Sequence, residues 1–321
     1  MKATAIAHPI QGLIKYHGLK KPNQRIPFHD SISVCVDALH SITTVEVDGS
    51  LKENIVVVNG KHVTNRDKER VEIVLSKLKK LAEYPGFFKV VSQNNVKTGK
   101  GLGFSASGFA ALGVAASKAL NLHLNYVLLS EIVRLGAGSA TRSLAGGFAL
   151  WHANKDEHSY AEQLASPDNI DFSMVIVPIH SEIKTDEAHA EVLSSPLFEA
   201  RLRNISHLTR IMKSAIMSGD IATIGRLAEE DTLNLHAITM TGKSHLVLWE
   251  PDTIRLIREV TKLRNSGVEC WYSIDTGPSV FVNTFQKYAH VIADRLAELG
   301  FSNVIIGGIG GKPKLTNEHL F

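Results

Sequence analysis

The segment with the clearest chemistry is a glycine-rich loop that carries two lysines and precedes a run of small helix-forming residues. It reads Lys97-Thr98-Gly99-Lys100-Gly101-Leu102-Gly103-Phe104-Ser105. Glycines at alternate positions keep Cβ atoms away from the backbone, so a bulky anion can approach the peptide N–H groups. A following helix directs its unpaired N–H groups and positive dipole end at such an anion. The segment therefore predicts a phosphate site, with an ordinary tight turn as the alternative.

The common nucleotide-binding motifs are absent. A P-loop needs two glycines flanking four residues, then Lys and Ser or Thr. The nearest match, residues 307–312, is followed by Pro313 where the hydroxyl should stand. No G-x-G-x-x-G opens a helix after a strand, and neither G-x-S-x-G nor H-E-x-x-H occurs, so dinucleotide and hydrolase readings have little support.

Two further segments combine a cation with small or polar neighbours. In Lys15-Tyr16-His17, Lys15 and His17 share a face of an extended chain, and a lysine beside a phosphate supplies a point charge. The alternative is a surface lysine on an edge strand. In residues 136–147, Arg142 stands among hydroxyls and small residues, a composition suited to gripping a carboxylate with two hydrogen bonds. Helix packing on small residues is the alternative there.

Two more segments complete the candidate site. Asp275 ends an apolar strand just before Gly277-Pro278, where it either caps a turn or serves as a fixed carboxylate that accepts a hydroxyl proton. Arg66 and Arg70 have i, i+4 spacing and share one helix face. They form either an anion clamp or a solvated face.

Composition narrows the class of protein. The chain has 321 residues, 44% hydrophobic and 21% charged, which is ordinary for a globular protein with two lobes. A net charge of +3 is too weak to argue for nucleic acid. Cys35 and Cys270 lie far apart and favour neither a disulfide framework nor a zinc site, so we expect a reducing cytoplasm. No leader-like or membrane-spanning apolar stretch is seen, and we expect no membrane partner.

The elements that must position these residues can be read from periodicity. Strands are expected at 31–36, 43–47, 55–58, 87–91, 148–152 and 174–178, and helices at 66–83, 104–120 and 128–135. After residue 178, amphipathic helices are expected around 197–216, 221–235 and 254–263, then strand 268–274, strand 280–282, helix 284–299 and strand 303–306. This order predicts an α+β second lobe with an antiparallel sheet. We place the lobes at 1–180 and 181–321.

Together these segments resemble the GHMP kinase superfamily and, within it, the mevalonate diphosphate decarboxylase branch. The matching segments keep their order over nearly the whole chain: 12–18, 94–111, 138–147, 195–201, 234–237 and 274–280. The resemblance implies a two-lobed α+β GHMP kinase fold, with an N-terminal lobe like domain 2 of ribosomal protein S5 and a ferredoxin-like C-terminal lobe. It also implies an enzyme that uses ATP and Mg²⁺.

Departures from that branch concern the substrate tail. Leu19 stands where the branch usually has lysine, and Phe104 precedes Ser105 where it has two serines. One basic group and one hydroxyl fewer suit a less charged tail. Segments 8–12, 29–35 and 318–321 are similar to the phosphomevalonate decarboxylases of the archaeal-type mevalonate pathway. Those enzymes convert mevalonate 5-phosphate into isopentenyl phosphate.

The resemblance also implies roles for individual residues. Asp275 lies near the 3-hydroxyl and orients it or takes its proton, Lys15 offsets charge on the reacting phosphoryl group, and Arg142 with Ser139 grips the C1 carboxylate. The 5-phosphate end is assigned to Tyr16, His17 and Arg70. The nucleotide phosphates are assigned to Asn95, Gly101, Gly103, Ser105 and Ser107. A homodimer is expected by the same resemblance.

Three alternatives stay open at this point. The chain resembles most closely a monophosphate decarboxylase, but a diphosphomevalonate decarboxylase with altered motifs differs from it only in substrate preference. A GHMP small-molecule kinase would stop after phosphorylation and release no CO2. A non-catalytic nucleotide-binding protein on the same fold would not need Lys15 and Asp275.

Overall fold

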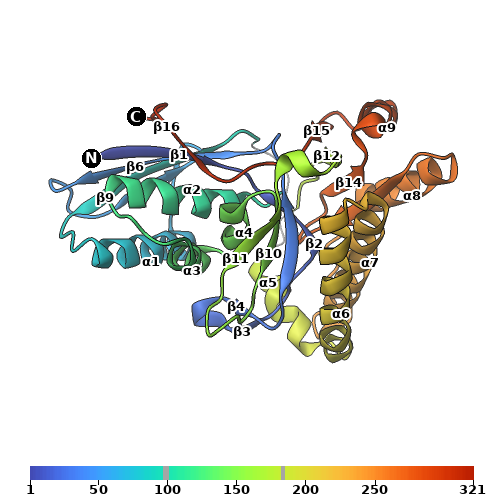
Figure 1. Cartoon of the computed structure of the whole chain (residues 1–321), viewed down its shortest axis with the longest axis horizontal. Helices are drawn as coiled ribbons and strands as arrows, with labels where there is room; N and C mark the ends of the chain where they lie inside the picture. The colour runs from blue at the N-terminus through green and yellow to red at the C-terminus, as the bar shows by residue number, and fades with distance from the viewer. Residues whose placement is uncertain (97–100, 182–184) are drawn as a thin grey trace.

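The computed structural model describes residues 1–96, 101–181 and 185–321. Lys97 and Lys100 of the glycine-rich loop lie outside the described residues. The first half is built on a six-stranded sheet that is antiparallel except where β7 pairs with β9. Its order is β16 (Lys314–Thr316), β1 (Lys2–Ala7), β6 (Ser41–Asp48), β9 (Phe87–Asn94), β7 (Ile55–Val58) and β8 (Lys61–His62). Because β1 pairs with β16, the two ends of the chain meet at one edge of this sheet (Figure 1).

Three helices cover one face of the six-stranded sheet: α1 (Asn65–Leu81), α2 (Phe104–Ala119) and α3 (Tyr126–Gly136) (Figure 1). In α1 the residues Val71, Val74 and Leu78 are buried at helical spacing. The central helix α2 is nearly all small residues, which allows close packing: a Cβ at Gly113 would lie 2.3 Å from the Val133 side chain of α3. The beginning of α2 is thereby fixed next to the glycine-rich loop.

A second, four-stranded antiparallel sheet crosses the middle of the molecule. Its order is β11 (Ala161–Ala165), β10 (Phe148–Trp151), β5 (Ser31–Cys35) and β2 (Ile10–Ile14). The short helix α4 (Ala140–Ala145) packs against it, and a small hairpin is formed by β3 (Leu19–Lys21), the 3-10 turn η1 (Pro22–Gln24) and β4 (Ile26–Pro27). Every residue of β2 is buried, because the strand lies between the two halves.

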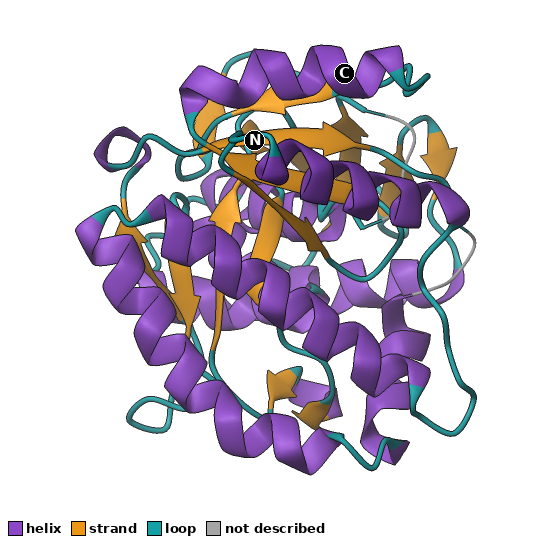
Figure 2. Ribbon diagram, turned by 90° about the vertical axis from the view of Figure 1, so that its right-hand side faces the viewer, coloured by secondary structure: helices purple, strands orange, loops and turns teal. Residues whose placement is uncertain are grey.

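The second half contains a four-stranded antiparallel sheet in the order β13 (Cys270–Ile274), β14 (Val280–Thr284), β12 (Ser173–Val177) and β15 (Ile305–Gly307). The helices of this half are α5 (Thr185–Glu191), α6 (Phe198–Ser218), α7 (Ile221–Met240), α8 (Pro251–Asn265) and α9 (Gln286–Glu298), with 3-10 turns η2 (Pro167–Asn169) and η3 (Val192–Ser194). From this side the long helices lie in front of the strands (Figure 2).

Three hydrophobic clusters stabilise these layers. One lies between α1, α2, α3 and the six-stranded sheet, and another packs α8 and α9 on the sheet of the second half. The largest joins the halves: Leu13 and Ile14 of β2 pack in one cluster with Met212 of α6 and Leu227 of α7. Lys15, which directly follows β2, is therefore anchored next to a core that both halves share.

The α+β class and the antiparallel second sheet agree with the sequence predictions, as do all the predicted helices. The strands β1, β2, β3, β4, β8, β11 and β16 and the short helices α4 and α5 were not predicted. The boundary near residue 180 stays a prediction. Two strands lie across it in the sheets, since β12 pairs with β14 and β15 while β16 pairs with β1. Among the described residues, no helix has the length and apolar character needed to cross a bilayer.

Candidate active site

A cavity of roughly 650 Å³ opens between the two halves. Its walls come from β2 and the residues that follow it, the beginning of α2, the segment before α4, the beginning of α1 and the turn after β13. The predicted residues that line it are Lys15, Tyr16, His17, Arg66, Arg70, Gly101, Gly103, Ser105, Ser139, Arg142 and Asp275. Residues more than 200 positions apart in the chain thus contribute to one site.

Arg142 is the most unusual group in this cavity. It is on α4, its side chain is 2% exposed, and burial lowers the pKa of its guanidinium. Within the described chain its Nε and Nη1 are buried without a hydrogen-bond partner. Leaving charged donors buried and unpaired is costly. A carboxylate bound by two hydrogen bonds would satisfy them.

Aromatic rings hold the Arg142 guanidinium in place. It lies 5.4 Å from the ring centre of Tyr16 and 5.7 Å from that of Trp151, and these two rings meet edge to face. A Cβ at Gly138 would lie 2.8 Å from the Tyr16 hydroxyl and 2.7 Å from Trp151, so only glycine fits there. The small residues before Ser139 therefore make room for the rings that position Arg142. Ser139 itself is half-buried in the same wall of the cavity.

Asp275 lies across the cavity from α4, at the end of β13. Both carboxylate oxygens accept hydrogen bonds from the Gly12 N–H, at 3.1 and 3.0 Å. A side chain at position 12 would collide with Asp275 and Lys15, because a Cβ there lies 2.9 Å from Asp275 Oδ1 and 2.8 Å from Lys15 Cγ. Burial raises the pKa of Asp275, against the opposing charges of Lys15 and Arg142.

Lys15 is 4% exposed and is held by the second half of the molecule. Its Nζ donates to Thr232 Oγ1 at 3.0 Å and to Ser273 Oγ at 2.9 Å, with the Ala228 carbonyl at 3.4 Å. Burial lowers the pKa of Lys15, while the carboxylates of Asp231 and Asp275 oppose that shift. The ammonium thus sits beside Asp275 with its donors directed at the protein.

A buried ion pair fixes the backbone of Lys15, and the sequence analysis did not find it. Arg201 of α6 and Asp231 of α7 are 2.9 Å apart and almost fully buried. Asp231 accepts from the Lys15 N–H at 2.8 Å, and Arg201 donates to the Lys15 carbonyl at 2.6 Å. Both charges stand at core-facing positions of amphipathic helices, next to residues such as Ile205 and Leu235. A charge on an apolar face was the signal available in the sequence.

His17 lies farther along the same wall and is kept neutral. It is almost fully buried, and burial followed by the neighbouring His189 lowers its pKa well below the usual value. Its Nε2 lies 2.7 Å from the Oγ1 of Thr276, the residue that follows Asp275 in the chain. His189 of α5 also stacks on Tyr16, with ring centres 5.0 Å apart. Neither Thr276 nor His189 was predicted, although both line the cavity.

The glycine-rich loop reaches the cavity, but only part of its predicted set does. Gly101 and Gly103 have φ of +82° and +76°, and both line the cavity with Ser105. A Cβ at Gly103 would lie 2.5 Å from the Ile10 carbonyl, so this glycine is also required by packing against β2. The absence of a Cβ therefore serves the loop's own backbone as well as access for an anion.

Asn95 and Ser107 are placed away from the cavity. The Asn95 side chain accepts from the His40 N–H and donates to the Ala38 carbonyl, so it fixes a neighbouring loop. Ser107 is fully buried and its hydroxyl lies 2.7 Å from that of Ser41. Both residues were predicted to bind the nucleotide because they are polar and lie near the glycine-rich loop in sequence. The course of the loop and of α2 directs their side chains away from the cavity.

Arginines gather at the end of the cavity formed by α1 and the β3–β4 hairpin. Arg66 and Arg70 both line it, as their shared helix face predicted. Arg70 Nε donates to the Gly136 carbonyl at 2.7 Å, and its guanidinium lies 5.0 Å from the ring centre of Phe109. A third arginine, Arg25, lines the same wall. It was not predicted, since it stands alone between two prolines.

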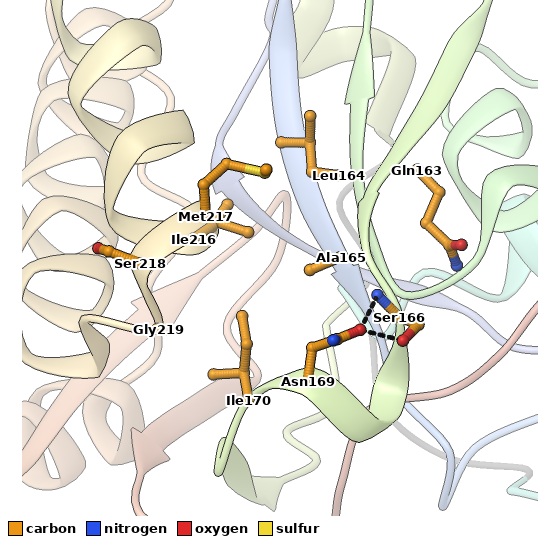
Figure 3. A pocket seen from close by; sticks show the side chains of 10 residues that line it. All are labelled: Gln163, Leu164, Ala165, Ser166, Asn169, Ile170, Ile216, Met217, Ser218 and Gly219. Carbon is orange, nitrogen blue, oxygen red and sulfur yellow. Dashed lines mark hydrogen bonds between the residues drawn. The ribbon is translucent and has the colours of Figure 1, made fainter.

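A second hollow of roughly 320 Å³ lies apart from this cavity, between β11, η2 and the end of α6 (Figure 3). Its lining holds amides, hydroxyls and aliphatic groups. Asn169 faces Ser166 across a hydrogen bond from the Ser166 N–H at 3.1 Å. None of its lining residues is titratable. Of these two cavities, the first is the one lined by titratable side chains.

Mg²⁺ fits the first cavity as a partner of bound phosphates. The described residues contain no cluster of three acidic, histidine or cysteine side chains that would form a protein-only metal site. Mg²⁺ commonly binds through substrate phosphates, water and one or two protein oxygens. The exposed hydroxyl of Ser105, at the beginning of α2, provides such an oxygen on the cavity wall.

Comparison with known proteins agrees with this geometry. The model of the diphosphomevalonate decarboxylase-like N-terminal domain matches residues 7–161, and that of the mevalonate 5-diphosphate decarboxylase C-terminal domain matches residues 184–303. Phosphomevalonate decarboxylase of Haloferax volcanii is 37% identical over 99% of this chain and 98% of its own.

Solved structures give the same assignment. Mevalonate diphosphate decarboxylase from Enterococcus faecalis is 30% identical with a TM-score of 0.90, and 99% of each chain is covered. A complex with MVAPP, AMPPCP and magnesium is 29% identical with a TM-score of 0.91 and the same coverage. The chain therefore has the GHMP kinase fold and belongs to the diphosphomevalonate decarboxylase family.

Proposed function

We propose that this protein catalyses the ATP-dependent decarboxylation of mevalonate 5-phosphate to isopentenyl phosphate, with release of ADP, phosphate and CO2. One observation supports it above the others: the buried guanidinium of Arg142, with unused donors, faces the same cavity as Asp275 and the glycine-rich loop. A kinase that left the carboxylate untouched would not need such a group. The higher identity to the phosphomevalonate enzyme, 37% against 30%, favours the monophosphate.

Asp275 acts on the 3-hydroxyl of the substrate. The Gly12 N–H fixes its carboxylate, and burial raises its pKa, which makes it a stronger base than an exposed aspartate. It accepts the hydroxyl proton as the oxygen attacks the γ-phosphate of ATP. Lys15 stands beside it and offsets negative charge that gathers there during transfer.

Arg142 acts on the carboxylate. It binds C1 through two hydrogen bonds and holds the carboxylate in line with the C3–O bond, with Ser139 beside it. When the phosphorylated oxygen leaves C3, the electron pair of the C1–C2 bond forms the new double bond and CO2 departs. Tyr16, His17 and Arg70 face the 5-phosphate end. Gly101, Gly103 and Ser105 bind the nucleotide phosphates with Mg²⁺, which supplies positive charge there.

The test is the release of ADP and of CO2 with ATP and Mg²⁺, comparing mevalonate 5-phosphate with mevalonate 5-diphosphate at matched concentrations. We expect both products in equal amounts, with strong preference for the monophosphate and isopentenyl phosphate as product. Preference for the diphosphate would contradict the substrate assignment. ADP without CO2 from either substrate would show a kinase instead.

A homodimer and a cytoplasmic location complete the proposal. Both stay predictions: the homodimer is drawn from the family resemblance, and the cytoplasmic location from the cysteine usage of the sequence. The molar mass in solution, measured by light scattering across a range of protein concentrations, tests the first: a mass near 35.1 kDa would contradict it. Fractionation of cells that express the chain tests the second.

A further inference from the structure

Arg25 has a fixed place at the edge of the catalytic cavity. It follows η1 with a φ of 51°, a left-handed conformation that is uncommon outside glycine, and its N–H donates to the Pro22 carbonyl at 3.0 Å. The preceding carbonyl, of Gln24, accepts from Arg134 Nε at 3.0 Å. The β3–β4 hairpin that carries Arg25 lies beside α3 (Figure 1). The main chain at Arg25 is thus held in place by its neighbours.

Two arginines share the end of α3. Arg25 Nε donates to the Leu135 carbonyl at 3.0 Å, and Arg70 Nε donates to the next carbonyl, of Gly136, at 2.7 Å. These are the last two residues of the helix, whose carbonyls have no partner within the helix. Arginine near a helix C-terminus is favoured by the dipole as well. The two guanidinium groups are therefore brought to neighbouring points of one wall.

Helix capping alone does not account for Arg25. Capping uses only Nε, and within the described chain neither Nη1 nor Nη2 of Arg25 forms a hydrogen bond. Arg25, Arg66 and Arg70 line this part of the cavity with Asp67, which pairs with Arg70 at 3.3 Å, while the other acidic lining residue among those described is Asp275 beside Lys15. Such an excess of positive charge favours a bound anion.

The position of this wall identifies which anion. Leu135 and Gly136 run directly into residues 137–139, which line the cavity beside Arg142. An extended substrate whose carboxylate is bound by Arg142 therefore directs its other end toward this wall or toward the glycine-rich loop. The loop, at the beginning of α2, suits the nucleotide. The arginine wall is left for the phosphorylated tail.

We propose that Arg25 is a substrate-specificity residue that binds the 5-phosphate of the substrate through its Nη groups, next to Arg70. The proposal rests on the function proposed above. A guanidinium with Nε already held by a carbonyl loses little further freedom when it binds phosphate oxygens. The charge at this end then matches a phosphorylated tail.

The test compares Arg25→Asn with Lys21→Asn. Asparagine tolerates the left-handed backbone at position 25, so the fold is kept while the guanidinium is removed. Lys21 is an exposed lysine of the same hairpin that does not line the cavity, and its replacement changes net charge equally. We expect Arg25→Asn to raise the KM for mevalonate 5-phosphate by about 10- to 100-fold and to leave the KM for ATP within about twofold. Lys21→Asn should change neither.

Binding without turnover separates this proposal from the proposed function. Calorimetric titration of mevalonate 5-phosphate, mevalonate 5-diphosphate and unphosphorylated mevalonate should show that Arg25→Asn weakens the two phosphorylated ligands and not mevalonate. That result would support Arg25 even if the wild-type enzyme released no CO2. Equal weakening of all three ligands, an effect on ATP alone, or no change would overturn it. Partial recovery of phosphate binding in Arg25→Lys would add support.

Discussion

Arg142 and Lys15 are two buried cations of one cavity, and they differ in what surrounds their donors. Lys15 Nζ is fully engaged by Thr232, Ser273 and the Ala228 carbonyl, and its backbone is clamped by an ion pair. The Arg142 guanidinium lies over the rings of Tyr16 and Trp151, and two of its donor atoms are buried without a hydrogen-bond partner among the described residues. The protein itself supplies acceptors for the Lys15 ammonium, whereas Nε and Nη1 of Arg142 have none among the described residues and can bind a ligand.

The difference indicates how the site divides stability and function. An unsatisfied buried donor costs about 1–3 kcal/mol, more when it is charged. The fold bears that cost at Arg142, where the substrate carboxylate can remove it. At Lys15 the protein has supplied the acceptors itself, so the charge is held in one position beside Asp275 before substrate arrives. Residues that destabilise the free protein are commonly those that contact the ligand.

The largest effect is expected for Arg142→Met. Loss of the two-pronged grip on the carboxylate should lower kcat/KM for decarboxylation by roughly 1,000-fold or more. Unfolding in urea should show a free energy unchanged or increased, since an unsatisfied charge has been replaced by an apolar side chain of similar length. A loss of stability in Arg142→Met would contradict the comparison.

Arg134→Met is the matched control for that experiment. Arg134 is also buried, but its guanidinium donates to the carbonyls of Gln24 and Ser159 and it lies outside the cavity lining. We expect the opposite result there, a clear loss of stability with a smaller change in activity. Similar behaviour of the two variants would show that burial, rather than ligand readiness, sets the outcome.

Asp275→Asn tests the other side of the cavity. The amide keeps the shape of the side chain but cannot accept the hydroxyl proton, so kcat should fall by roughly 100- to 1,000-fold while the KM for mevalonate 5-phosphate changes little. Steady-state ADP release measures both. Near-normal turnover would remove Asp275 from the proton transfer, and a large rise in KM alone would make it a binding residue.

Lys15→Met should separate the two cations most directly. It leaves the Thr232 and Ser273 hydroxyls without their donor, so we expect a loss of about 2 kcal/mol in the free energy of unfolding together with a loss of activity. Urea unfolding and ADP release on the same preparation give both values. If activity fell while stability held, Lys15 would behave like Arg142 and the contrast would be wrong.

Much of this arrangement was predictable from the sequence, because a repeating pattern of apolar residues indicates a long helix. The helices α1, α6, α7 and α8 repeat apolar residues over many turns, α2 is a run of small helix formers, and each was expected. The short elements give no such signal: β1 is rich in alanine, which has low strand propensity, and β16 has three residues. They form because β1 has β6 and β16 as partners, which is a tertiary property.

The site divides in the same way. Arg142 and Asp275 stand in segments whose residue composition suggests a binding site, so both were predicted as site residues. The structure brings both to one cavity. Arg25 and the pair of Arg201 with Asp231 have no local motif, since their partners lie 110, 186 and 216 residues away. Asn95 is the opposite case: its polar type and its position beside the loop suggested a nucleotide contact, but its side chain bonds to His40 and Ala38 outside the cavity lining.

The smallest effect is one of pH, and it tests whether the buried histidine beside Lys15 stays neutral in the folded protein. His236 of α7 is fully buried, and burial followed by Lys15 lowers its pKa from 6.5 to about 3. Below pH 6.5 the unfolded chain takes up a proton that the folded protein does not. Stability from this group is therefore complete above pH 6.5 and is lost toward pH 3, at about 1.4 kcal/mol per pH unit.

Between pH 7 and pH 5 the unfolding free energy of the wild type should thus fall by about 2 kcal/mol more than that of His236→Gln. The exposed His62→Gln is the control and should follow the wild type. Lys15→Met should change this dependence between pH 7 and pH 5 only slightly, because burial is the larger cause and still lowers the pKa of His236. Parallel curves for the wild type and His236→Gln would contradict the lowered pKa, and a flat curve for Lys15→Met would show that the ammonium, rather than burial, sets it.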